Sequence, residues 1–156
     1  MQNKLNKHKI LFVCHGNICR SPMAEFVMKD LVRKAHREGD FYIDSAATST
    51  EEIGNGVHYG TRAKLEQVGV PVGSHHARQV TKQDYKDFDL ILLMDQYNCR
   101  NIKRILPNDP DGKIKMLLDY TDRTDKNIAD PWYTGNFDET YKDVLEGCEG
   151  LLAALK

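Results

Sequence analysis

The sequence lacks the features that would direct it to a membrane or to nucleic acid. No apolar run approaches the roughly 20 residues that a membrane-spanning helix needs. The basic start, residues 1–10, is not followed by an apolar stretch with a cleavage site. Lys and Arg total 22 against 23 Asp and Glu, so the chain offers no overall basic footprint to nucleic acid. We therefore expect a cytoplasmic protein with neither a membrane nor a nucleic-acid partner.

Two further absences narrow the chemistry. None of the four cysteines forms a C-x-x-C pair, so we expect no structural zinc site. No Gly-Lys-Ser/Thr ending follows a glycine-rich loop, so the use of ATP or GTP is not indicated. In a reducing cytosol the cysteines should stay thiols unless they have redox work. Cys148 lies in a helical pattern and is expected in the core.

Short apolar runs alternate with helical patterns along the chain. Strands are predicted over residues 9–13, 41–46, 87–95 and 113–120, and helices over residues 23–38, 57–69, 96–106 and 137–156. Asn136 or Asp138 could cap the last helix, and residues 122–136 form a long polar loop. This alternation predicts an α/β fold with a parallel sheet and helices on both faces. We expect one domain over residues 1–156, with residues 1–8 as a flexible tail.

In such a sheet, ligands bind beyond the carboxyl ends of the strands, near a switch point in strand order. The segment that starts at Cys14 follows the first predicted strand, so we expect it there. Loops after the other strands open on the same edge. Ser45, Asp95 and Asp130, which are distant in sequence, could therefore converge on Cys14.

The stretch VCHGNICRSPMAE, residues 13–25, has the composition of an anion-binding loop. Backbone N–H groups and the N-terminus of the following helix can bind a phosphate, and Gly16 and Asn17 tolerate the left-handed backbone that such a loop needs. Arg20 supplies a planar fork for two oxyanion oxygens. A thiol in this setting ionises readily, so Cys14 can attack a bound phosphoryl group. Ser21 could donate its hydroxyl to the sulfur.

This chemistry also needs a proton donor for the leaving oxygen, and the stretch ADPWY, residues 129–133, offers one. Asp130 precedes a proline that stiffens the turn. Trp132 and Tyr133 could form a wall of the pocket and stack on an aryl group. Taken alone, the stretch could equally be a turn with two packing aromatics, and the cysteine loop favours the functional interpretation.

With these motifs the chain resembles the low-molecular-weight protein tyrosine phosphatases. VCHGNICRSPMAE, DSAATS, SHHARQV, FDLILLMD and ADPWY follow one another in the order of that family and span essentially the whole chain. The resemblance implies a flavodoxin-like three-layer sandwich with a four-stranded parallel sheet. It also implies hydrolysis of phosphotyrosine through a phosphocysteine, without a metal or other cofactor.

The resemblance assigns roles residue by residue. Cys14 resembles the nucleophile, Arg20 the phosphate-binding arginine and Asp130 the general acid, while Asn17, Ser45 and His75 match a network that supports the loop. Cys19 matches a second loop cysteine that can form a reversible disulfide with Cys14. The full set expected to contact phosphate or substrate is His15, Gly16, Asn17, Ile18, Cys19, Arg20, Ser21, Glu51, Trp132 and Tyr133.

Three positions depart from common family members. His15 replaces an apolar residue, and Glu51 stands where several relatives carry an aromatic that lines the cleft. Both changes make the mouth of the cleft more polar. Trp132 stands where vertebrate members often have tyrosine, so a phosphorylation switch at that position is not carried over, although Tyr133 remains.

Three rival functions stay open. Arsenate reduction on the same fold needs further cysteines, and Cys99 has Leu92 where its relay partner would stand. Phosphoarginine phosphatases carry threonine at the position of Ile18. A non-catalytic phosphate-binding module would need neither the thiolate nor the acid.

The expected partner is a phosphotyrosine protein or peptide, with a cognate tyrosine kinase as one candidate. We expect a monomer, with a weak dimer as the alternative.

Overall fold

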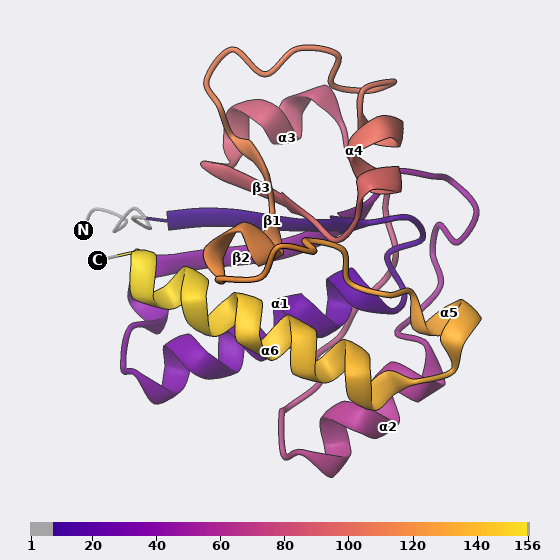
Figure 1. The fold of residues 1–156 in the computed structure, drawn as a ribbon, viewed down its shortest axis with the longest axis vertical. Helices are drawn as coiled ribbons and strands as arrows, with labels where there is room; N and C mark the ends of the chain where they lie inside the picture. The colour runs from indigo at the N-terminus through magenta and orange to yellow at the C-terminus, as the bar shows by residue number, and fades with distance from the viewer. Residues whose placement is uncertain (1–7, 156) are drawn as a thin grey trace.

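A sheet of four parallel strands, in the order β2-β1-β3-β4, organises the chain (Figure 1). The structure is a computed structural model that describes residues 8–155. Its strands are β1 (His8–Cys14), β2 (Phe41–Ala47), β3 (Leu90–Leu93) and β4 (Ile114–Met116). Since β1 lies between β2 and β3, the order of connection reverses there, and the loop after β1 stands at the switch point of the sheet.

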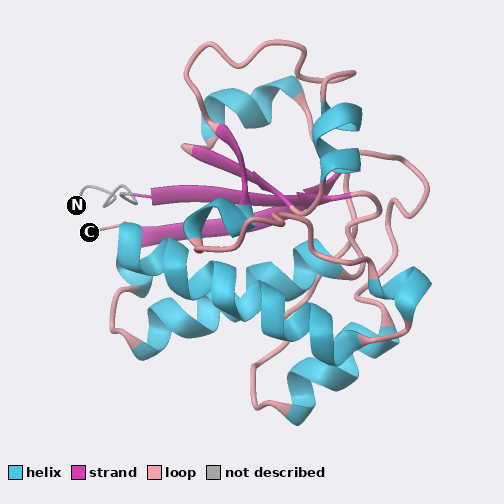
Figure 2. Cartoon of the chain, in the orientation of Figure 1, coloured by secondary structure: helices cyan, strands magenta, loops and turns pink. Residues whose placement is uncertain are grey.

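Helices cover both faces of the sheet, as predicted (Figure 2). On one side lie α1 (Arg20–Lys34), α2 (Tyr59–Gln67) and α6 (Phe137–Ala154), with α1 and α6 packed together. On the other side lie α3 (Lys82–Asp87) and α4 (Gln96–Ile102). The short helices are η1 (Glu38–Asp40), η2 (Leu117–Tyr120) and α5 (Pro131–Thr134). The expected three-layer α/β sandwich is confirmed.

Strand β1 is buried on both faces, which explains its unbroken apolar run. Ile10 and Phe12 point into the larger core with α1 and α6, whereas Leu11 and Val13 point into the core with α4. All four side chains have no exposed surface. The loop after β1 is thus anchored by two packed layers, a firm base for a site at the end of the strand.

Most predicted elements are present with shorter or shifted bounds. The first helix begins at Arg20 rather than after Pro22, which is tolerated because a proline in the first turn lacks a donor that would have no partner there. Asn136, rather than Asp138, caps α6 by accepting a bond from the Glu139 N–H group. The helices α3 and α5 and the 3₁₀ turns η1 and η2 were not predicted. Of the predicted tail, residues 1–7 lie outside the described residues, and His8 is already the first residue of β1.

The fourth predicted strand, residues 113–120, was partly wrong. Only Ile114–Met116 is a strand, and the chain then turns into η2. Two glycines of α6 allow η2 to pack closely against that helix. A Cβ added at Gly150 would lie 2.0 Å from the Tyr120 carbonyl oxygen, and one added at Gly147 would lie 2.6 Å from Leu117 Cγ. Apolar periodicity could not reveal this close approach between distant segments.

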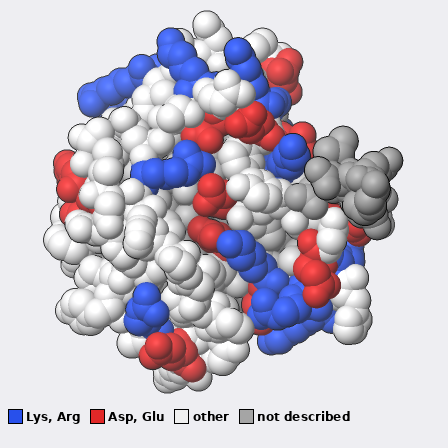
Figure 3. Space-filling model, turned by 180° about the vertical axis from the view of Figure 1, so that it is seen from behind, with Lys and Arg blue, Asp and Glu red and all other residues white. Residues whose placement is uncertain are grey.

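Charge is spread over the surface without a dominant sign. On the face shown in Figure 3, acidic and basic side chains lie interspersed, in keeping with the nearly balanced counts in the sequence. Among the described residues, no helix is long and apolar enough to span a membrane.

Candidate active site

The loop that joins β1 to α1 surrounds the Cys14 sulfur with hydrogen-bond donors. The N–H groups of Asn17 and Ser21 point to Sγ at 3.3 and 3.4 Å. The Ser21 hydroxyl lies 3.1 Å from the same sulfur. Two N–H donors converge on one buried sulfur beside a hydroxyl that can also donate, an arrangement that stabilises a negative charge there. The predicted nucleophile is therefore held in a setting that suits a thiolate.

Asn17 holds this loop in shape from behind. Its φ of 60° is left-handed, as the sequence suggested, and its side chain is fully buried. Its Nδ2 donates to the hydroxyl oxygens of Ser21 at 2.8 Å and Ser45 at 2.9 Å, and its Oδ1 accepts a bond from the Arg78 N–H at 3.2 Å. His75 Nε2 lies 2.8 Å from the Asn17 carbonyl oxygen. The predicted supporting residues are thus brought together.

Two members of this network were missed by sequence reasoning. Glu25, on α1, accepts a 2.6 Å bond from the Ser45 hydroxyl and is 4% exposed. Arg78 is fixed by ion pairs with Asp44 and Asp84. An acidic residue within the apolar face of a helix was the available signal for Glu25. For Arg78 the sequence held none, because its contacts with Asp44 and Asn17 join segments that are distant along the chain.

Arg20 lies at the start of α1 with only 2% of its surface exposed. Its Nη1 donates to Asp95 Oδ2 at 2.5 Å and to the Ile128 carbonyl at 2.9 Å, and its Nη2 lies 3.3 Å from Asp130 Oδ2. Burial alone would lower the pKa of Arg20, but the charges of Cys14, Asp95 and Asp130 outweigh it and raise the pKa. Arg20 is a permanent, oriented positive charge.

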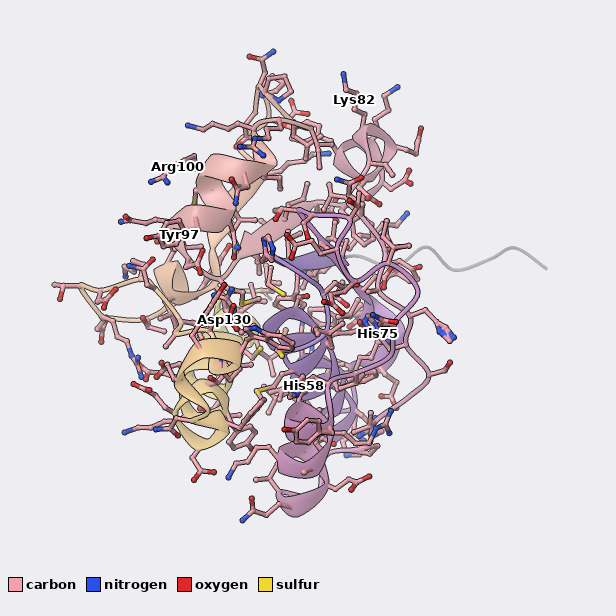
Figure 4. The ribbon with its side chains drawn as sticks, turned by 90° about the vertical axis from the view of Figure 1, so that its right-hand side faces the viewer. His58, His75, Lys82, Tyr97, Arg100 and Asp130 are labelled. Atoms are coloured by element: carbon pink, nitrogen blue, oxygen red, sulfur yellow. The ribbon has the colours of Figure 1, made fainter. Side chains whose placement is uncertain are left out.

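Asp130 reaches the site from α5. Its Oδ1 caps this helix by accepting a 3.0 Å bond from the Trp132 N–H, which leaves Oδ2 directed to Arg20. Ser45, Asp95 and Asp130 lie around the site as predicted, but they reach Cys14 through other residues. Asp95 and Asp130 meet Arg20, while Ser45 acts through Asn17. Figure 4 faces this edge of the sheet and shows Asp130 near its centre, between Tyr97 and His58.

A cavity of about 110 Å³ opens over the loop. His15 and Glu51 stand at its mouth with His15 Nε2 3.1 Å from Glu51 Oε1, and both side chains are well exposed. Of the predicted binding residues, Asn17 and Ser21 do not line the cavity, because their side chains point behind the loop; Glu52 lines it and was not predicted. The lining residues are Cys14, His15, Gly16, Ile18, Cys19, Arg20, Glu51, Glu52, Asp130, Trp132 and Tyr133.

The other cysteines differ sharply from Cys14. Burial, together with the charges of Cys14 and Asp130, raises the pKa of Cys19 to about 12, so this thiol keeps its proton. Cys148 is fully buried in the core, as predicted. Cys99 lies on α4 with its sulfur 3.3 Å from the Met116 sulfur. Within residues 8–155, no group of His, Cys, Asp and Glu side chains has the arrangement of a metal site.

Comparison with known proteins identifies the family to which this chain belongs. The sequence model of the low molecular weight phosphotyrosine protein phosphatase family matches residues 9–156, and the chain belongs to this family. It is 43% identical over 148 residues to the low molecular weight protein-tyrosine-phosphatase YfkJ of Bacillus subtilis, covering 94% of this chain and 95% of YfkJ. The crystal structure of YfkJ superposes with a TM-score of 0.92 at 42% identity and covers 98% of this chain and 97% of YfkJ.

Two further proteins match this chain over nearly their whole length. The low molecular weight phosphotyrosine protein phosphatase of Gallus gallus is 43% identical over 148 residues, with 92% of each chain covered. The crystal structure of the Drosophila arginine phosphatase DARP superposes with a TM-score of 0.86 at 34% identity, covering 94% of this chain and 97% of DARP. The resemblance seen in the motifs is confirmed.

Proposed function

We propose that this protein hydrolyses phosphotyrosine in proteins or peptides through a phosphocysteine on Cys14. The observation that carries the proposal is the convergence of two N–H donors and the Ser21 hydroxyl on the Cys14 sulfur, with Arg20 and Asp130 at the same cavity. Membership of the phosphotyrosine phosphatase family supports the same substrate class.

In the first step the Cys14 thiolate attacks phosphorus, a bond from sulfur to phosphorus forms, and the bond from phosphorus to the aryl oxygen breaks. Asp130 gives its proton to the departing oxygen, so the phenol leaves neutral. Arg20 and the loop N–H groups stabilise the negative charge on the transferring group. These groups would supply the positive charge of the site without a metal.

In the second step Asp130, now a carboxylate, takes a proton from a water molecule that attacks phosphorus. The bond from sulfur to phosphorus breaks, inorganic phosphate is released, and the thiolate of Cys14 is restored. Ser21, whose hydroxyl lies beside the sulfur, would stabilise it as the leaving group.

The rival functions have less support. DARP carries the name of an arginine phosphatase, but Ile18 lines the cavity here, and a branched apolar side chain should crowd a guanidinium-linked phosphate. Arsenate reduction would need a relay of thiols, whereas Cys99 contacts Met116. We further propose a cytoplasmic, single-domain monomer, with a tyrosine kinase among its phosphoprotein partners.

The deciding experiment is hydrolysis, in EDTA, of matched peptides bearing phosphotyrosine, phosphoserine or phosphoarginine, with arsenate plus thioredoxin as a further arm. We expect phosphotyrosine turnover that is abolished by Cys14→Ser and slowed about 10²- to 10⁴-fold by Asp130→Ala. Selective phosphoarginine turnover would overturn the assignment. Phosphate binding without any turnover would indicate a binding module instead.

A further inference from the structure

His58 stands immediately before α2 and joins that helix to the phosphate loop. Its Nδ1 accepts a 3.0 Å bond from the Gly60 N–H, so the side chain caps the helix. Its own backbone N–H donates to the Ile18 carbonyl at 2.8 Å. The backbone of His58 is thus fixed relative to the cavity, which makes its ring a rigid support for neighbouring groups.

The ring of His58 lies among three aromatic side chains. It stacks on Tyr59 with centroids 4.4 Å apart and on Phe137 at 5.5 Å. It meets Trp132 edge to face at 5.6 Å and 73°. Between residues 8 and 155, His58 is the one aromatic ring in contact with Trp132, which is 58% exposed. His58 therefore supports the Trp132 ring from one side.

The backbone of Trp132 is one of two groups that hold the carboxylate of Asp130, and Arg20 is the other. The Trp132 N–H donates to Asp130 Oδ1 at 3.0 Å, and only Pro131 separates the two residues. Helix α5 has four residues, too few to be stable without tertiary contacts. Figure 4 shows His58 and Asp130 on the same side of the molecule.

We propose that His58 is a positioning residue for the general acid: its ring holds Trp132, and through Trp132 it holds Asp130 where a proton can reach the leaving oxygen. The inference rests on the proposed phosphatase function and adds to it a residue outside the cavity lining. It predicts a specific signature. Losing the contact between His58 and Trp132 should slow the hydrolysis of substrates whose leaving group needs a proton. It should leave unchanged the hydrolysis of substrates whose leaving group departs as a stable anion.

Two substitutions at His58 distinguish the role of its aromatic ring from its role as the helix cap. His58→Asn keeps an oxygen acceptor for the Gly60 N–H and removes the ring. His58→Phe keeps an aromatic ring and removes the acceptor. If His58 acts only as a cap, His58→Phe should show the larger defect. If His58 positions the general acid, His58→Asn should show the larger loss of activity. The loss of a cap should lower the melting temperature of His58→Phe by about 2–4 °C.

The readout is kcat/KM for phenyl phosphate and for para-nitrophenyl phosphate, because kcat/KM reports the first chemical step. An aromatic contact of this geometry biases a conformation by about 2- to 13-fold. We expect His58→Asn to lose about that factor with phenyl phosphate and less than about twofold with para-nitrophenyl phosphate. His58→Phe should stay within about twofold of the wild type with both substrates.

Two controls test the route through Asp130. Tyr59→Ala removes a ring that stacks on His58 but forms no ring contact with Trp132 among the described residues. We expect its ratio of phenyl to para-nitrophenyl turnover to match the wild type. In an Asp130→Asn background no acid remains to be positioned, so adding His58→Asn should not change that ratio further.

Equal losses with both substrates in His58→Asn, or an undiminished effect in the Asp130→Asn background, would overturn the inference. So would a larger change of the ratio in His58→Phe than in His58→Asn. These results are distinct from a failure of the proposed function, in which the wild type itself would hydrolyse neither aryl phosphate.

Discussion

Replacing Asn17 by alanine should damage both stability and catalysis, because this buried side chain ties the phosphate loop to three other segments. Asn17→Ala removes three hydrogen bonds, at about 1 kcal/mol each. It also places alanine at a φ of 60°, which costs about 1 kcal/mol more. The sum is about 4 kcal/mol, a large part of the roughly 5–15 kcal/mol that stabilises a typical domain.

Urea denaturation of three variants can separate these contributions. Asn17→Gly loses the same bonds without the steric cost, so it should be more stable than Asn17→Ala by up to about 1 kcal/mol. Ser45→Ala removes one partner of Asn17 and one partner of the buried Glu25 carboxylate, and it should cost about 2–4 kcal/mol. Loosening of the loop should lower kcat/KM of Asn17→Ala about 100-fold. A loss of stability below about 1 kcal/mol in Asn17→Ala, or a less stable Asn17→Gly, would refute the reasoning.

Four other predictions can be tested separately. Gly150→Ala should destabilise the protein by about 1–3 kcal/mol in urea denaturation, because the added methyl overlaps η2; an unchanged midpoint would contradict the packing. Iodoacetamide at neutral pH should alkylate Cys14 and spare Cys19, whose raised pKa of about 12 keeps it protonated until strongly alkaline pH, as peptide mass spectrometry would show. After peroxide treatment, dithiothreitol should restore the wild type but not Cys19→Ser if the predicted disulfide protects the nucleophile. Glu51→Gln removes an exposed negative charge beside His15. The KM for an anionic substrate should therefore fall about two- to fivefold at low salt and by less at high salt. The free energy of unfolding should change by under about 1 kcal/mol.

The sequence predicted the parts of the fold that depend on local pattern. Apolar strand runs and helical periodicity are local, so the alternating α/β order and the edge where Cys14 lies could be inferred from them. The fourth strand was predicted too long: after Met116 the chain turns into η2, which packs against Gly150 in a contact between distant segments. Propensity alone gives no information about such contacts.

Residues of the candidate site likewise fall into those that the local sequence indicates and those that only contacts between distant segments reveal. Cys14 and Arg20 share one loop, so their spacing alone indicated their joint chemistry. Ser45 and His75 could be named only through a family resemblance, because nothing in their neighbouring residues indicates contact with Asn17. His58 was overlooked altogether, since its importance comes from rings contributed by α5 and α6.

The buried support of the phosphate loop has a kinetic consequence. The side chain of Asn17 and the sheet beneath it hold the loop amides in place by contacts within the protein itself. An incoming anion therefore meets a preformed receptor and does not have to wait for the backbone to rearrange. In stopped-flow experiments, the observed rate of oxyanion binding should rise linearly with concentration, as a single bimolecular event, rather than level off at the speed of a slow isomerisation.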